Sequence, residues 1–184
     1  GGLERIAATT SGNADVFMLD VFLPTIRALE AVSGRLYADE SLRRSFRIVA
    51  EHLRAAVFLI ADGALPSNTD QGYFTRRLLR RAVRHLDLLG IGENTLSRLA
   101  EPVATAYVDA YPYLLKKLGI IKTEIGNEEE KFRKTLDAGL KEFNKIVQNL
   151  SDSKVLRGAD AFMLFSSYGL PIDMICELAP ENGL

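Results

Sequence analysis

The stretch from Pro66 to Leu89 constrains the fold most, because it places arginines and apolar residues on opposite sides of one predicted helix. At about 100° per residue, five arginines fall within an arc of roughly 140°. They are Arg76, Arg77, Arg80, Arg81 and Arg84. Six apolar side chains fall on the opposite side: Leu78, Leu79, Ala82, Val83, Leu86 and Leu89. Such a helix buries one face in the core and presents a face of arginines. Turn-forming residues precede it, and Ser67 or Asp70 is expected to cap it.

Most of the remaining chain shows apolar residues at three- and four-residue steps, which is typical of amphipathic helices. The run from Val16 to Leu23 fits either a strand or a buried helical turn. Few segments alternate with a period of two. The sequence therefore predicts an all-α fold, an irregular multi-helix bundle. Its expected helices cover residues 24–33, 38–61, 94–108 and 125–150, and another helical pattern begins at Leu114 after the interruption at Pro112. Two short helices follow after residue 158, with a turn at 168–171.

Composition excludes several other classes of protein. The chain has 184 residues, the size of one ordinary domain. Its one cysteine, Cys176, cannot form an intramolecular disulfide, and neither histidine belongs to a metal-ligand pattern, so no metal site is predicted. Cys176 is expected to be a buried small residue, His52 a structural residue and His85 a surface or boundary residue. The longest apolar run is too short to span a membrane, and no signal-peptide pattern is present. We expect a cytoplasmic protein without a membrane partner.

The charge is unevenly distributed. The formal net charge is −1, yet residues 76–85 carry five arginines and no acidic residue. This contrast favours a defined docking site for an anionic partner over a general basic surface. Two other interpretations stay open at this point. The arginine face could be solvated, or it could pair inside the fold with Glu128, Glu129 and Glu130. We expect this acidic run to form a solvated first turn of its helix.

A series of motifs resembles alanyl-tRNA synthetases, in the helical domain that follows their class II catalytic core. In chain order these motifs are Ile60–Gly63, Pro66–Asn68, Gly72–Tyr73, Arg76–Arg84, Asn127–Phe132 and Tyr168–Asp173. The resemblance extends over nearly all of the chain. The first six residues, Gly1 to Ile6, are similar to class II motif 3.

The resemblance implies two parts and a role in protein biosynthesis. Residues 1–14 would be a remnant of the catalytic core, and residues 15–184 a helical tRNA-recognition domain. The family attaches alanine to tRNA-Ala with ATP and Mg²⁺, and Arg5 would hold the ATP phosphates. Motifs 1 and 2, the editing region and the C-terminal region have no counterpart in this sequence. We therefore assign no catalytic residue, and expect that the chain alone needs no cofactor and does not activate alanine.

The same resemblance implies that the chain binds the tRNA-Ala acceptor stem. The planar guanidinium of arginine suits phosphate, so all five arginines of the 76–84 series are predicted contacts. Asn68 has a donor and an acceptor in one amide, and the family implies that it reads a G·U pair in the shallow minor groove. Ser166 stands where family members carry the aspartate that assists this reading. Serine has no charge and a shorter reach, so Ser166→Asp is expected to sharpen discrimination.

A second function remains open. The chain could be a helical protein-interaction or scaffold domain that derives from a synthetase but no longer reads tRNA. Salt dependence separates the two, because phosphate contacts weaken steeply as salt rises. A self-contained enzyme is disfavoured, since the sequence offers no nucleophile–base or metal constellation.

Overall fold

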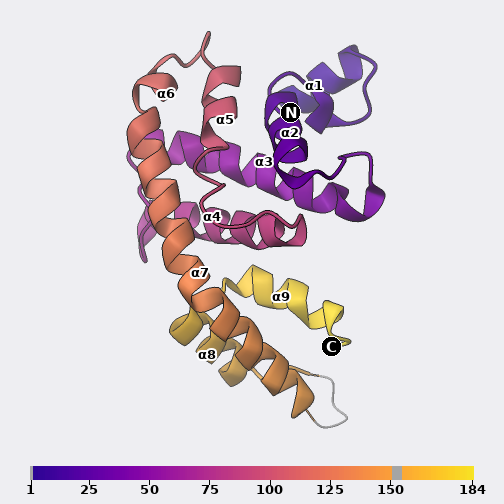
Figure 1. Cartoon of the computed structure of the whole chain (residues 1–184), viewed down its shortest axis with the longest axis vertical. Coiled ribbons are helices and arrows are strands. Elements are labelled where there is room, and N and C mark those ends of the chain that lie inside the picture. The colour runs from indigo at the N-terminus through magenta and orange to yellow at the C-terminus, as the bar shows by residue number, and fades with distance from the viewer. Residues whose placement is uncertain (1, 151–154) are drawn as a thin grey trace. The chain divides into compact units, whose positions relative to one another are not determined.

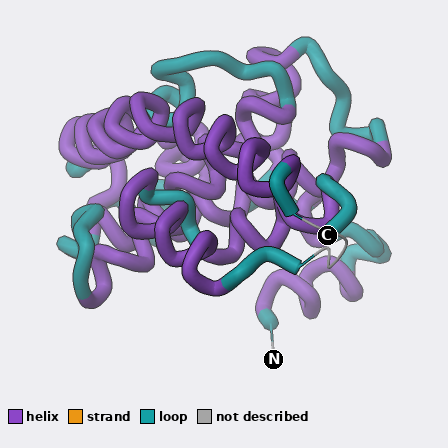
Figure 2. Tube along the Cα trace, turned by 90° about the horizontal axis from the view of Figure 1, so that it is seen from below, coloured by secondary structure: helices purple, strands orange, loops and turns teal. Residues whose placement is uncertain are grey.

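The computed structural model describes residues 2–150 and 155–184 of the chain (Figure 1). Within these residues the regular elements are helices and no strand occurs, which confirms the predicted all-α class (Figure 2). The elements are α1 (Leu3–Thr10), the 3₁₀ helix η1 (Val16–Met18), α2 (Leu23–Ser33), α3 (Glu40–Ala61), α4 (Asp70–Leu88), α5 (Ala100–Ala106), α6 (Tyr113–Lys116), α7 (Leu118–Gln148), α8 (Gly158–Tyr168) and α9 (Ile172–Glu181).

The chain divides into two compact units, residues 1–128 and 129–184. The sequence predicts a different boundary, between residues 14 and 15, which separates a remnant of the catalytic core from the helical domain. That boundary stays a prediction. None of the helices in the described residues is long and apolar enough to cross a membrane.

The first unit is organised around α3 and α4, which pack against each other along their apolar faces (Figure 1). Phe46, Val49 and Leu53 of α3 are fully buried, as are Leu79 and Leu86 of α4. Each such side chain contributes about 1.5–3 kcal/mol when it leaves water. Helices α2 and α5 also pack on α3. The arginine-bearing helix is therefore one of the two central helices of this unit.

Local signals set the ends of α2 and α3 where the sequence predicts them. Pro24 lies in the first turn of α2, where its missing N–H is not needed. Gly34 ends that helix in the left-handed conformation, at φ 66°. The Asp39 carboxylate accepts from the backbone N–H of Ser41 and so caps α3. The predictions for 24–33 and 38–61 are confirmed to within two residues.

Two predicted features at other helix starts are wrong. Helix α5 begins at Ala100 instead of Asn94, because a start at 94 would place Pro102 in the helix interior, where it lacks a donor and clashes with the preceding turn. Neither Ser67 nor Asp70 caps α4, whose N-cap residue is Thr69 without a side-chain hydrogen bond. The Ser67 hydroxyl donates instead to the Thr69 carbonyl oxygen at 2.8 Å.

Helix α7 joins the helical pattern that begins at Leu114 to the helix predicted over 125–150, and this changes the surroundings of its acidic residues. It runs without a break from Leu118, so Glu128 and Glu129 lie well inside the helix. Both side chains are buried, whereas Glu130 is exposed. The idea that this acidic run forms a solvated first turn is therefore wrong for Glu128 and Glu129.

The second unit contains residues 129–148 of α7 together with α8 and α9. Gly169, at φ 69°, ends α8 in the left-handed conformation, and Pro171 precedes α9. These two short helices and their turn match the prediction. Cys176 is exposed, because α9 buries Met174 and Ile175 instead. Its predicted burial is wrong.

Candidate nucleic-acid interface

The turn before α4 presents Asn68 at the surface. Asn68 is exposed, and its neighbour Ser67 donates its backbone N–H to the Gly72 carbonyl oxygen at 3.1 Å. A Cβ at Gly72 would come within 2.2 Å of the Leu65 carbonyl oxygen. Residue 72 must therefore be glycine for the turn to fold back on the first turn of α4. This close approach fixes the turn in which Asn68 lies, two residues before α4 begins.

Two of the five arginines lie against α7. Nε of Arg80 donates to Oε1 of Glu128 at 2.6 Å, and each of these side chains is only 7% exposed. Nε of Arg76 lies 3.2 Å from the same oxygen, with its side chain 27% exposed. Burial lowers the pKa of Arg80, while the charge and hydrogen bond of Glu128 act in the opposite direction. The pairing inside the fold that the sequence left open is thus present for Arg76 and Arg80.

Arg81 lies on the other flank of the arginine arc, against α3. Its Nη1 is 3.1 Å from Nε2 of His52. A guanidinium has no acceptor, so Nε2 must accept and the ring must carry its proton on Nδ1. His52 is buried, as the sequence analysis expected of a structural residue. His85 is also buried and lies 3.0 Å from the Ser45 hydroxyl, whereas the sequence placed it at the surface or boundary.

The middle of the arc faces outward. Arg77 is exposed and Arg84 is half-buried. With Arg81 they form an i, i+4, i+7 series along one side of α4. The structure therefore brings three of the five predicted arginines to a continuous outward stripe.

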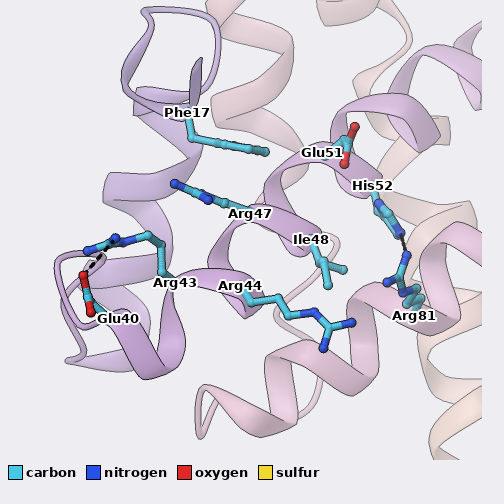
Figure 3. A pocket seen from close by; sticks show the side chains of 9 residues that line it. All are labelled: Phe17, Glu40, Arg43, Arg44, Arg47, Ile48, Glu51, His52 and Arg81. Carbon is cyan, nitrogen blue, oxygen red and sulfur yellow. Dashed lines mark hydrogen bonds and ion pairs between the residues drawn. The ribbon is translucent and has the colours of Figure 1, made fainter. Parts of the chain in front are cut away.

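A second group of arginines, which the sequence analysis did not single out, lies on α3. Arg43 and Arg44 from one turn of α3, Arg47 from the next turn and Arg81 from α4 line a cleft of about 530 Å³ (Figure 3). The rest of its wall is formed by Phe17, Glu40, Ile48, Glu51 and His52. The signal was present in the sequence as arginines at i, i+1 and i+4 on the polar side of the helix predicted over 38–61. The sequence analysis interpreted that helix only through its apolar face, which predicts the core and not a binding surface.

The arginines of this cleft differ in how firmly they are held. Arg47 donates from Nε to the Tyr37 hydroxyl at 2.8 Å and from Nη2 to Asp15 at 2.9 Å. Its guanidinium also lies 5.5 Å from the centre of the Phe17 ring. Arg43 lies 3.5 Å from Glu40, whose side chain is 87% exposed. Arg47 is thus a fixed part of the wall. Arg43 has a weak surface ion pair and a hydrogen bond from Nη2 to the Ala38 carbonyl oxygen at 3.1 Å.

The two other predicted site residues lie elsewhere. Ser166 is exposed in the last turn of α8, in the second unit. Arg5 is exposed on α1, and its neighbour Glu4 pairs with Arg54 at 2.7 Å. Among the described residues no group of three or more histidine, cysteine, aspartate or glutamate side chains could hold a metal ion.

Comparison with known proteins decides the family. Residues 1–184 match the profile of the family described as tRNA synthetases class II (A). The chain is 44% identical to the alanine–tRNA ligase of Borreliella afzelii, over 99% of this chain and 31% of that protein. It is 43% identical to the enzyme of Lactococcus lactis and 42% identical to that of Thermus thermophilus, over 99% of this chain and 21% and 20% of those proteins. This chain belongs to the alanyl-tRNA synthetase family. It spans between 20% and 31% of the length of these relatives.

Proposed function

We propose that this chain binds the acceptor stem of tRNA-Ala as part of an alanine–tRNA ligase, the enzyme that joins alanine to its tRNA with ATP. The outward stripe of Arg77, Arg81 and Arg84 carries this proposal. The helix contains no lysine, so its cations are planar forks suited to phosphate oxygens rather than mobile point charges. Phosphate contacts position a nucleic acid without reading its sequence.

Arg76 and Arg80 have a different part in this proposal. Arg76 can offer its terminal nitrogens to a phosphate while Nε stays on Glu128, since its side chain is 27% exposed. Arg80 would have to leave a buried carboxylate to reach RNA, and an unpaired buried charge is expensive. We therefore propose Arg76 as a contact at the border of the surface and Arg80 as a residue that holds α4 to α7.

Base reading is assigned to Asn68 and Ser166. Asn68 is exposed at the end of the arginine stripe, and its amide can donate and accept toward one base edge. The wide minor groove of an A-form stem makes that edge accessible. Ser166 is also exposed, and we propose it as the second reading group, with a neutral hydroxyl in place of the family's aspartate.

The family also implies ATP with Mg²⁺ for the whole enzyme, and Arg5 is the residue of this chain that we propose for the ATP phosphates. An exposed guanidinium on α1 fits one phosphate contact. The described residues offer no carboxylate cluster for Mg²⁺, so the ion would be held by parts of the enzyme outside them. Arg5 would orient the phosphates, and the nucleotide itself supplies the activation of alanine.

One observation favours the second candidate, a scaffold domain that no longer reads tRNA. Glu128 already occupies two of the five arginines, which narrows the surface available to phosphate. A protein partner that binds through apolar contacts would show little dependence on salt, whereas phosphate contacts lower log K by about 0.7–0.9 per decade of salt for each phosphate neutralised.

The test is the affinity of this chain for a tRNA-Ala acceptor-stem duplex at several salt concentrations. We expect Arg77→Ala/Arg81→Ala to weaken binding and reduce the salt slope, while Arg27→Ala/Arg98→Ala, which removes two exposed arginines elsewhere, leaves both unchanged. Asn68→Ala should keep the slope and lose the preference for a G·U over a G·C stem. Equal effects of the two double variants would contradict the proposed surface.

A further inference from the structure

We propose that the RNA-binding surface continues from α4 onto α3, and that the cleft around Arg43, Arg44 and Arg81 takes the sugar–phosphate backbone of the bound stem. This inference rests on the proposed function and adds a second set of phosphate contacts to it. The ligand is a run of neighbouring phosphodiesters, and the contacting groups are arginine side chains of α3.

Continuity between the two helices is the first argument. Arg81 belongs to the outward stripe of α4 and also lines the cleft, together with Arg44 and Ile48 of α3 (Figure 3). A backbone that contacts Arg81 therefore reaches the α3 arginines without leaving the surface. On α3, residues 43, 44 and 47 fall within an arc of roughly 100° on the polar side of the helix.

The chemistry of the lining is the second argument. Four arginines and no lysine line the cleft, against the carboxylates of Glu40 and Glu51. Its volume of about 530 Å³ lies in the range that accepts nucleotide-sized ligands. The excess of guanidinium groups over carboxylates gives the cleft a positive potential that attracts phosphate, and the planar guanidinium fork suits phosphate oxygens.

The third argument is that part of the cleft is already ordered. Asp15 and Tyr37 fix Arg47, and His52 holds Arg81. Groups that are fixed before binding lose less entropy when the ligand arrives. Arg43 pairs with the exposed Glu40 at 3.5 Å, and its Nη2 donates to the Ala38 carbonyl oxygen at 3.1 Å. Such surface pairs are weak, so a phosphate can replace that carboxylate.

His52 follows as a positioning residue for Arg81. Its Nε2 accepts from Arg81, so it directs the guanidinium without touching the RNA. Glutamine at this position keeps an acceptor, while leucine keeps bulk and removes it. We expect His52→Leu to lower the salt slope of RNA binding by the contribution of one phosphate contact, and His52→Gln to retain most of the original slope. In a chain that already carries Arg81→Gln, His52→Leu should have no further effect on the slope.

The decisive experiment compares three double variants on the same acceptor-stem duplex. Arg43→Gln/Arg44→Gln tests the cleft, Arg77→Gln/Arg84→Gln tests the α4 stripe, and Arg27→Gln/Arg98→Gln is the charge-matched control. With about 0.7–0.9 per phosphate contact, the α3 variant should lower the slope by about 1.4–1.8. It should also lose about tenfold in affinity at low salt. Thermal melts check that all variants fold, which we expect because these arginines lie outside the buried core.

The outcomes separate this inference from the proposed function. If the α4 variant loses slope and the α3 variant matches the control, the inference is wrong and the proposed function stands. A loss in the α3 variant with none in the α4 variant supports the cleft and refutes the α4 contacts. If the unsubstituted chain shows no salt-dependent binding at all, both fail. Additive effects of His52→Leu and Arg81→Gln would refute the positioning role alone.

Discussion

Glu128→Gln tests whether the buried pairs of α4 and α7 are structural. The substitution keeps the size of the side chain but removes the charge that faces Arg80 at 2.6 Å and Arg76 at 3.2 Å. Arg80 is then a buried cation without its carboxylate. Breaking a buried pair by removing one partner costs about 3–5 kcal/mol of unfolding free energy. At about 2–4 °C per kcal/mol, the melting temperature should fall by about 6–20 °C.

Glu130→Gln is the matched control, two residues along the same helix. Glu130 pairs with Lys134 at 2.7 Å, but the two side chains are 63% and 69% exposed. Exposed pairs contribute about 0–1 kcal/mol, so the same chemical change should leave the melting temperature nearly unaltered. Calorimetry and urea unfolding of both variants give the comparison.

The double variant Arg80→Met/Glu128→Leu completes the cycle. Replacing both members of a buried pair by apolar residues of similar size is often neutral or stabilising. We therefore expect the double variant to recover most of the stability that Glu128→Gln loses, which a double-mutant cycle expresses as a coupling free energy. The reasoning is refuted if Glu128→Gln is no more destabilising than Glu130→Gln.

Four shorter predictions follow from other parts of the structure. Gly72→Ala should distort the turn before α4 and lower both stability and RNA affinity, because its Cβ meets backbone at 2.2 Å; Gly119→Ala, which adds a Cβ in open space, should do neither in melts and binding titrations. Ser166→Asp should raise the G·U over G·C affinity ratio of the stem, and an unchanged ratio removes this residue from base reading. Burial opposes ionisation of Asp15, but hydrogen bonds from Tyr37 and Arg47 outweigh it and lower its pKa below the ordinary 3.8. The ionised carboxylate therefore stabilises the fold fully above pH 3.8, and this stabilisation is lost as pH falls through the lowered pKa of the folded state. Acid titration of Asp15→Asn should accordingly show a shallower loss of stability below about pH 4 than the unsubstituted chain. Finally, this chain should show no alanine-dependent pyrophosphate exchange, and turnover by the purified chain would contradict that expectation.

The helices could be predicted where local chemistry ends them. Pro24, Gly34 and Asp39 each start or end a helix through contacts within one turn of their own position. The bounds of α2 and the start of α3 can therefore be predicted from the sequence. The beginning of α5 depends on Pro102, which fits the first turn of a helix but not its interior. From Leu118 on, the apolar pattern that begins at Leu114 and the helix predicted over 125–150 form one continuous helix, α7.

The candidate site was predicted only in part, because burial depends on neighbours distant in sequence. Glu128 lies four residues before Phe132, at the edge of the apolar stripe of its helix. Periodicity does not reveal that Arg80, 48 residues earlier, lies opposite it. Likewise His85 sits between the two faces of α4, and its burial follows from the approach of α3 and Ser45. The exposure of Cys176 depends on which side of α9 the second unit covers.

The angular pattern of a helix gives the direction of each side chain but not the width of the arc that its neighbours cover. On α4 the covered arc is wider than the apolar residues alone indicate. Glu128 of α7 pairs with Arg80 at one edge of the arginine face, and His52 of α3 contacts Arg81 at the other edge. The outward stripe from Arg84 to Arg81 then spans only roughly 60°. A surface this narrow holds few phosphates by itself. The arginines of α3 lie around one cleft with Arg81 of α4. Helix α3 therefore covers part of the arginine face of α4 and, in our proposal, adds its own arginines to the phosphate-binding surface.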